Sequence, residues 1–272
     1  MHGKYIIAFC HIPKTAGMSW TRILRGYFGI RHLSVIRRKP PTEYTYEDMK
    51  FDLKIFPWIK SLAGHPLRPY IDYKEFSKRL IWYTFLREPW SRFLSQYQHE
   101  VEKGKKTESL EEWMEKYDRR NFQVRWIAGK EDLDLAKSIL KKFHFVGRQD
   151  KYRLSIELLL NLLGLPSSLI NYIKSINKMR NTQLRLEIDN NARKIKQKIM
   201  RYNELDFELW DWFKFNYWPN QVSRIAENNY NFENYENDVS LKRFKLSLIY
   251  SFLMRNVLYK PIVRIHSIFT SF

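Results

Sequence analysis

The chain has 272 residues, 44% hydrophobic and 16% aromatic, with a formal net charge of +19. This composition excludes a disordered chain, and the single cysteine excludes an intrachain disulfide framework. The length suits one domain with additions, and the excess of lysine and arginine indicates an anionic partner or substrate, although a compositional bias of the source would give the same charge.

The first apolar run, residues 5–10, is too short for a signal peptide or a membrane span, and no later run approaches about 18 residues. We therefore expect a protein that is cytoplasmic or peripheral to a membrane, with no signal peptide or transmembrane segment. A chain that had lost an N-terminal anchor would look the same. Cys10 ends the first run, where we expect it to be a small core residue.

Three runs predict buried strands, at residues 5–10, 80–86 and 143–147, and helical patterns follow each of them. This alternation predicts an α/β fold with a central, mostly parallel sheet flanked by helices. The stretch 38–76 holds five prolines, and we expect loops there with a short strand near residues 61–64.

Longer helical patterns cover residues 152–164 and 191–218, and the second is expected to end at Pro219. We predict a main domain over residues 1–235, followed by a basic, aromatic helical extension over residues 236–272 that packs on it.

Five apolar residues of the extension fall on one helical face: Leu246, Ile249, Tyr250, Leu253 and Val257. This face favours a terminal helix that docks on the core. The alternative is peripheral membrane contact, or partner binding, through residues 241–272.

The stretch HIPKTAGMSW, residues 11–20, joins the first strand to a helical pattern. Such a turn gathers backbone N–H groups, the Lys14 ammonium and two hydroxyls around one point, which is typical of an anion site. Gly17 would let the backbone approach closely. The turn is not a Walker loop, because only two residues separate Lys14 from Gly17. The expected ligands are Pro13, Lys14, Thr15, Ala16, Gly17, Met18 and Ser19.

A second anion site is predicted in TFLREPWSRFLSQY, residues 84–97. Arg87 ends a strand, a proline opens the next helix, and Ser95 offers a hydroxyl two turns later. A guanidinium suits a dianionic phosphate, although Arg87 could instead pair with Glu88 or Asp72. Two anion sites at the carboxyl ends of parallel strands describe a ligand with two separated anionic groups.

Both motifs resemble those of sulfotransferases that use 3′-phosphoadenosine 5′-phosphosulfate (PAPS). Among these the chain is most similar to heparan sulfate 6-O- and 2-O-sulfotransferases and their bacterial relatives. HIPKTAGMS is similar to the family's 5′-phosphosulfate loop, and YTFLREPWSRFLSQY to its 3′-phosphate motif, with Arg87 and Ser95 at the expected spacing. Three further segments match in order: RNFQVRWIAG, FVGRQDKYRLSIELL and NELDFELWDW.

The resemblance covers roughly residues 4–220 and implies a P-loop-nucleotide-kinase-like sulfotransferase fold. It implies transfer of a sulfuryl group from PAPS to a hydroxyl of a carbohydrate or glycoconjugate by in-line displacement. Lys14 would stabilise the departing phosphate, and His65, at the family's Gly-His position, would be the general base. Weaker candidate ligands of donor or acceptor are Gln123, Arg125, Arg180 and Thr182.

No metal is implied, and the sequence has no His/Cys/Asp cluster with metal-ligand spacing. The chain departs from the family at Arg148, Gln149 and Asp150, where Leu, Thr and Glu are usual, and at Met18, where Thr is commoner. The departures bear on the adenine contacts more than on the phosphate contacts.

The acceptor is expected to be a glycan, acidic or neutral, although a glycolipid or small hydroxylated metabolite stays open. Basic residues at 119–130 and aromatic residues at 44–58 are expected to line its cleft. One alternative function is a kinase-like phosphotransferase, which would need a Walker loop and a magnesium-binding acid. A nucleic-acid-binding module would explain charge and aromatics but not the paired motifs, so no nucleic acid is expected. The oligomeric state is left open.

Overall fold

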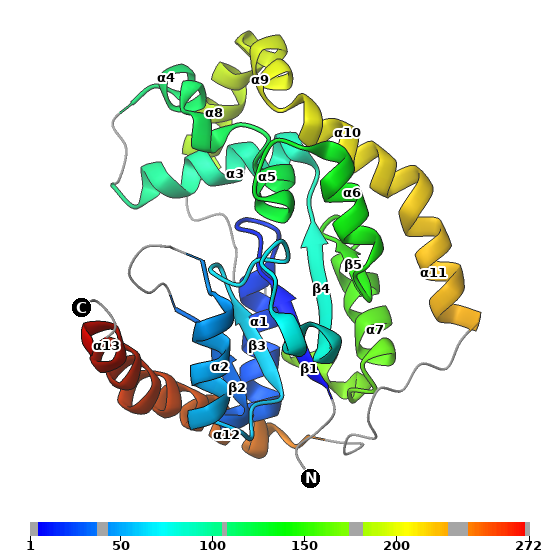
Figure 1. Cartoon of the computed structure of the whole chain (residues 1–272). Coiled ribbons are helices and arrows are strands. Elements are labelled where there is room, and N and C mark those ends of the chain that lie inside the picture. The colour runs from blue at the N-terminus through cyan, green and yellow to red at the C-terminus, as the bar shows by residue number, and fades with distance from the viewer. Residues whose placement is uncertain (1–4, 37–42, 105–107, 174–181, 228–238, 270–272) are drawn as a thin grey trace.

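The computed structural model of the chain describes residues 5–36, 43–104, 108–173, 182–227 and 239–269 (Figure 1). Its centre is a five-stranded sheet in the order β2-β3-β1-β4-β5, and every pairing is parallel. The strands are β1 (Ile6–Cys10), β2 (His32–Ser34), β3 (Ser61–Gly64), β4 (Leu80–Leu86) and β5 (Phe145–Arg148). Helices flank this sheet, so the predicted α/β fold is confirmed.

Alternate residues of β1 face two different core clusters, as the two-residue period of a strand requires. Ile7 and Phe9 pack in the cluster that includes α1 (Gly17–Phe28) and α7 (Tyr152–Leu162). Ile6 and Ala8 pack in the cluster that includes the helix α2 (Tyr46–Ile55). Because both faces are covered, β1 reads as a continuous apolar run, and the site-bearing loops must lie at the strand ends.

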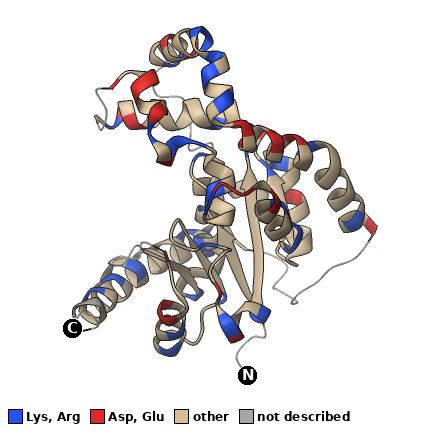
Figure 2. Ribbon diagram, turned by 45° about the horizontal axis from the view of Figure 1, so that its top comes forward, with Lys and Arg blue, Asp and Glu red and all other residues tan. Residues whose placement is uncertain are grey.

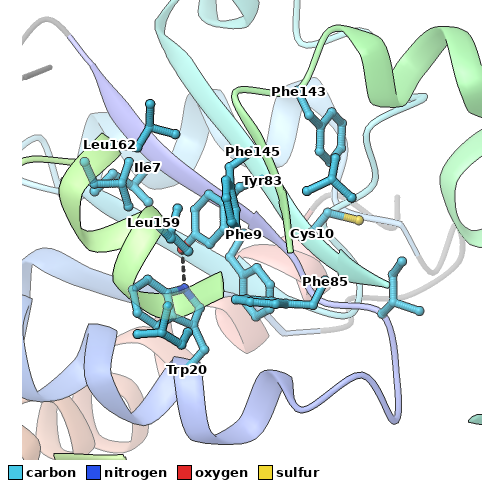
Figure 3. Packing of buried hydrophobic residues seen from close by; sticks show 14 of the residues in the cluster. Ile7, Phe9, Cys10, Trp20, Tyr83, Phe85, Phe143, Phe145, Leu159 and Leu162 are labelled. Atoms are coloured by element: carbon cyan, nitrogen blue, oxygen red, sulfur yellow. Dashed lines mark hydrogen bonds between the residues drawn. The ribbon is translucent and has the colours of Figure 1, made fainter. Parts of the chain in front are cut away.

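The larger cluster locks α1 onto the sheet (Figure 3). The Trp20 indole N–H of α1 donates to the Tyr83 hydroxyl of β4 at 2.7 Å. Phe9 stacks on Tyr83 and meets Phe85 edge-on. Cys10 is fully buried here, as expected, and burial raises the pKa of its thiol to about 12.

The loops predicted over residues 38–76 are wrong in one part, because α2 lies there. Thr45 and Asp48 close a capping box at its start, with the Asp48 N–H donating to Thr45 Oγ1 and the Thr45 N–H to Asp48 Oδ2. The helix buries only Met49 and Asp52, so its apolar period is too weak to stand out between the prolines. The short strand β3 was predicted, and β2 was not.

The helix predicted over residues 191–218 consists of five elements, with breaks at Ile195 and Asn203 and none between residues 204 and 227. They are α8 (Thr182–Lys194), α9 (Lys196–Tyr202), α10 (Glu204–Trp212), a π-helix (Phe213–Tyr217) and α11 (Trp218–Glu227). Pro219 does not end the helix as predicted. It is the second residue of α11, which continues the preceding π-helix without a break, so Pro219 lies within a continuous helix directly after the wider π-helical turn.

The other helices of this half are α3 (Pro89–Glu102), α4 (Leu110–Glu115), α5 (Phe122–Ala128) and α6 (Leu133–Lys141). The helix α7 ends two residues earlier than predicted and is followed by Gly164 in the left-handed region, with φ 64°.

The chain closes with α12 (Leu241–Leu253), a π-helix (Met254–Tyr259) and α13 (Lys260–Phe269), which follow one another without a break; we call them the C-terminal rod. Phe244 lies over Gly26, where an added Cβ would come within 2.2 Å of its ring, and stacks on Tyr172 at 4.2 Å. The Tyr259 hydroxyl donates to the buried Asp52 carboxylate at 3.1 Å.

The rod therefore packs on the core, but through a different stripe from the one the sequence favoured. The predicted boundary at residues 235 and 236 lies outside the described residues. Within the described part of the chain, no helix has the length and apolar content needed to cross a bilayer.

Candidate functional site

The loop that joins β1 to α1 carries a strained backbone. Lys14 and Ala16 have φ values of 69° and 70°, in the left-handed region that non-glycine residues avoid. The Thr15 hydroxyl, fully buried, donates to the Ile12 carbonyl at 2.9 Å and fixes the turn from inside. Backbone of this kind is characteristic of functional loops, and alternating left-handed residues turn N–H groups toward a common point that suits an anion.

The close approach at Gly17 is made by a histidine ring. A Cβ added there would lie 2.1 Å from Cδ2 of His11, so only glycine fits. His11 is 8% exposed and stacks on Phe9 with ring centroids 5.3 Å apart. Burial holds the pKa of His11 well below its usual value, and His65 and Arg25 lower it further. His11 is thus neutral and positions the loop.

Arg87, at the end of β4, joins the two predicted anion sites. Its Nη1 donates to the Lys14 carbonyl at 3.1 Å. The Arg87 backbone is held on both sides by Gln123 of α5, since its N–H donates to Gln123 Oε1 at 3.0 Å and its carbonyl accepts from Nε2 at 2.8 Å. Gln123, a candidate ligand, is 1% exposed and has its amide engaged in this way.

Asp206 of α10 holds α5 in turn. Its two carboxylate oxygens accept from the N–H groups of Gln123 and Val124 at 3.0 and 2.9 Å. Asp206 is 1% exposed, and burial raises its pKa, while Arg92 and the two N–H groups act in the opposite direction. The segments matched as RNFQVRWIAG and NELDFELWDW therefore meet behind Arg87.

The cations near the loop have acids in the neighbourhood but not in direct contact: Asp206 and Glu100 act on the charge of Arg92, and Glu88 acts on that of Arg87. Among the described residues, no carboxylate lies within ion-pair distance of Lys14, Arg87 or Arg92. Burial, followed by the Arg87 charge, lowers the pKa of Lys14 to about 8. Burial, followed by the Arg185 charge, lowers the pKa of Arg87 to about 10.

Several buried donors of this cluster have no hydrogen-bond partner in the described structure: Nε of Arg87, and Nε and Nη1 of Arg92. Unsatisfied buried donors are rare in proteins and often mark a ligand site. The Arg92 guanidinium lies over the Phe122 ring at 4.2 Å, so of these donors Nε of Arg87 is the one at the strand end. With the excess of positive charge there, it fits an anionic group.

The β5 end makes a contrast. Arg148 points its guanidinium at Asp150, with Nη2 to Oδ2 at 2.6 Å and Nε to Oδ1 at 3.1 Å. It also lies 5.6 Å from the Trp210 ring and 5.9 Å from the Trp218 ring. The cation at this strand end therefore carries its own counter-charge. These are the positions at which the sequence departs from the family pattern.

His65 follows β3 and meets the loop of β1. The register pairs Cys10 with Gly64, which sets His11 and His65 side by side, with ring centroids 4.2 Å apart. Nδ1 of His65 lies 3.0 Å from the His11 carbonyl oxygen. Because a carbonyl can only accept, Nδ1 carries the hydrogen and the basic lone pair is on Nε2. His65 is exposed at this edge of the sheet.

Sequence reasoning missed Arg68 and Trp126 beside His65. The Arg68 guanidinium lies 3.2 Å from the centre of a Trp126 ring, and Trp126 meets His65 edge-on at 5.8 Å. Phe122 stacks on Trp126 at 5.0 Å. Arg68 follows His65 by three residues and Trp126 lies within RNFQVRWIAG, so their position in or next to these motifs could have identified both.

The remaining candidates are spread more widely. Ser95 is half-buried on α3, Thr182 is exposed at the start of α8, and Arg180 lies outside the described residues. Within the loop, Pro13 and Ala16 are half-buried, Met18 is 48% exposed and Ser19 is 8% exposed.

The alternatives of Glu88 or Asp72 as partner for Arg87 are not realised. The Glu88 carboxylate accepts from the N–H groups of Trp90 and Ser91 at 2.9 and 2.7 Å and so caps α3. Asp72 accepts from the Lys74 N–H.

The basic residues at 119–130 have partners within the chain. They are Arg119 with Glu100, Arg120 over Tyr202, Arg125 over Tyr117, and Lys130 with Asp132. Of the aromatic residues at 44–58, Tyr44 and Phe56 are buried in the core. These contacts give no support to a cleft lined by those stretches. In the described residues, no group of three or more His, Cys, Asp or Glu side chains could hold a metal ion.

A cavity of about 400 Å³ lies between α3, α4 and α8. Apolar side chains such as Val101, Leu184 and Ile188 line much of it, and it includes neither Lys14 nor Arg87. Its chemistry does not suit a phosphate, and it is separate from the cations at the strand ends.

A parallel sheet with covered faces, a cationic turn after its central strand and a second cationic strand end define an open-sheet α/β protein, a class whose ligands bind at the carboxyl ends of the strands. The model of the Sulfotransferase family matches residues 1–215, which is most of the chain. The chain belongs to this family and is a transferase. A search of curated proteins finds none that matches.

Proposed function

We propose that this protein transfers a sulfuryl group from PAPS to a hydroxyl of a carbohydrate or glycoconjugate. The observation that carries the proposal is the Arg87 Nη1 contact with the Lys14 carbonyl at 3.1 Å. It brings two cations that follow different strands, neither with an ion-pair partner among the described residues, to one edge of the sheet. A nucleotide with one anionic group at its 5′ end and another at its 3′ position suits such a pair.

The residues present fit this donor. Residues 13–19 would hold the 5′-phosphosulfate with backbone N–H groups and the Lys14 ammonium, and Arg87 with Ser95 would hold the 3′-phosphate. The idle Nε of Arg87 supports this assignment. An anion next to Lys14 favours the charged ammonium and so raises its pKa from about 8. When bound, the donor supplies an activated sulfuryl group.

His65 acts as the general base in this proposal. Nε2 takes the proton of the acceptor hydroxyl while that oxygen bonds to sulfur and the bond from sulfur to the phosphate oxygen breaks. The Nδ1–H on the His11 carbonyl keeps the ring oriented throughout. Lys14 and the loop N–H groups stabilise the charge left on the phosphate.

Arg68 supports an acceptor with an acidic group. Its guanidinium lies 3.2 Å from the centre of the Trp126 ring, and the same ring meets His65 edge-on, so a cation is held close to the base. An acidic saccharide whose hydroxyl reaches His65 would place its own carboxylate or sulfate near Arg68. A neutral glycan would have no anionic group to pair with the Arg68 guanidinium.

The test of the base is His65→Ala. We expect transfer of labelled sulfuryl groups to a panel of oligosaccharides to fall by about 10²- to 10⁴-fold, with the donor Kd nearly unchanged. His266→Ala is the matched control. His266 lies in the C-terminal rod, where it stacks on Phe51 of α2, and this variant should keep full activity. Normal turnover by His65→Ala would reject His65 as the base.

Ligand binding separates this function from a kinase-like phosphotransferase. 3′-Phosphoadenosine 5′-phosphate should raise the Tm without magnesium, and ATP with magnesium should raise it little. A larger shift with ATP and magnesium would favour phosphoryl transfer instead.

A further inference from the structure

The C-terminal rod has an inner stripe that anchors it and an outer face with no partner among the described residues. The inner stripe is buried and comprises Phe244, Ser251, Met254, Tyr259 and Val263. Tyr259 bonds Asp52, and Phe244 fills the space over Gly26. The rod is therefore held in one orientation, and its other side faces outward.

The outer face is strongly apolar. Its exposed residues, with exposed fractions from 42% to 65%, are Leu246, Ile249, Tyr250, Phe252, Leu253, Val257 and Leu258. Between residues 246 and 258 the only charged side chain is Arg255, which is half-buried. These include all five residues that the sequence placed on one face. A soluble monomer rarely exposes such a continuous apolar surface without a binding role.

The charge around this face has one sign. Residues 239–272 contain six Lys and Arg and no Asp or Glu, and Figure 2 shows the basic residues along the rod. Lys242, Arg243 and Lys245 are exposed before the apolar part, and Arg264 is exposed after it. Next to the rod, the short helix η1 (Gly29–Arg31) adds an exposed isoleucine and an exposed arginine.

These charges argue against a second copy as the occupant. A two-fold contact through the outer face would bring the basic residues of one rod against those of the other, and like charges across an interface disfavour binding. A membrane with anionic lipids offers an apolar phase and negative headgroups at one surface, which matches both features of the rod. Tyr250 and Phe252 suit the boundary between headgroups and acyl chains.

We propose that the outer face of the C-terminal rod binds the surface of an anionic membrane. The rod lies in the plane of the interface, with its apolar side chains between the headgroups and its lysines and arginines on the phosphates. It does not cross the bilayer. This binding is independent of the proposed sulfotransfer, because the rod contributes no residue to the site at the strand ends.

The experiment is vesicle co-sedimentation of the full chain. We expect binding to vesicles with about 30% anionic lipid, little binding to phosphatidylcholine alone, and weakening as salt is added. The double variant Ile249→Asp/Phe252→Asp should lose binding with an unchanged Tm, since both residues are exposed. Lys242→Gln/Lys245→Gln should lower the partition coefficient about 30-fold.

Phe215→Asp is the matched control, because Phe215 is 64% exposed on the π-helix before α11 and should not affect vesicle binding. Equal binding to neutral vesicles, absence of binding, or full binding by Ile249→Asp/Phe252→Asp would overturn the proposal. So would a dimer, seen by sedimentation velocity, that this double variant separates, because the occupant would then be a second copy.

Discussion

The ends of β1 and β4 present cations to the same site but are held in different ways. The Lys14 turn is shaped locally, by two left-handed residues, a buried threonine and the ring of His11. Arg87 is held by Gln123, 36 positions along the chain, which is held in turn by Asp206. The cation after β1 is thus positioned within seven consecutive residues, 11–17, while the cation after β4 depends on contacts from distant segments.

The two strand ends also differ in the kind of unfavourable free energy that their local structure carries. The β1 turn stores backbone strain, of order 1 kcal/mol or more per left-handed non-glycine residue. At the β4 end the unfavourable contribution is the burial of a charged side chain, Arg92. Two of its nitrogens have no hydrogen-bond partner, and burial lowers its pKa to about 10. Substitutions at one strand end or the other can measure the two contributions separately.

Asp206→Ala should have the largest effect, on the β4 side. It leaves two buried N–H groups unpaired and removes the carboxylate charge that acts on Arg92. We expect a loss of about 3–5 kcal/mol in the free energy of unfolding, measured by urea denaturation. Asp211→Ala, exposed on the same helix, should cost less than about 0.5 kcal/mol. Similar values for the two variants would refute the long-range support of Arg87.

Arg87→Lys should affect ligand binding more than folding. It keeps the charge but loses the forked donors, including the one on the Lys14 carbonyl. We expect the Kd for 3′-phosphoadenosine 5′-phosphate, measured by calorimetry, to rise about 10- to 100-fold. Arg31→Lys, at an exposed position of η1, is the control. An unchanged Kd would mean that the 3′-phosphate lies elsewhere.

The pH dependence of nucleotide binding should report on the β1 side. The Lys14 pKa is lowered to about 8, so the ammonium is charged below that pH and neutral above it. A bound anion favours the charged form, so affinity should be constant below pH 8 and fall by up to tenfold per pH unit above it. Lys14→Arg should make the profile flat. A flat profile in the unmodified protein would remove Lys14 from the anion site.

Ala16→Gly should have the smallest effect, and it has a distinctive sign. Glycine adopts the φ of 70° without strain, so the free energy of unfolding should stay equal or rise by up to about 1 kcal/mol. Glu208→Gly, exposed in the middle of α10, should lower it by about 0.5 kcal/mol, because glycine destabilises a helix interior. Equal losses in both variants would show that the turn is not strained.

Much of this fold could be predicted because its signals are local. Buried strands β1 and β4 read as apolar runs, and a proline after Arg87 marks the start of α3. The elements that were missed have weak local signals: β2 has three residues paired only with β3, and α2 buries just two side chains. The helix over residues 191–218 was predicted as one piece ending at Pro219, because a uniform helical pattern shows neither the breaks at Ile195 and Asn203 nor the continuation to residue 227.

By itself, the sequence determined which residue types follow each strand, that Lys14 lies in a turn before a helix, and that the last helix has an apolar face and only basic charges. These are properties of short segments, set by periodicity, backbone preference and side-chain charge. Only the tertiary structure decided which cations have counter-charges and which helix face is covered. Arg148 forms an ion pair with Asp150 whereas Arg87 forms none with the described residues, and Phe244 is buried whereas Phe252 is exposed. Compensation of a charge and burial of a face depend on neighbours brought close in space, and spacing along the chain does not specify them.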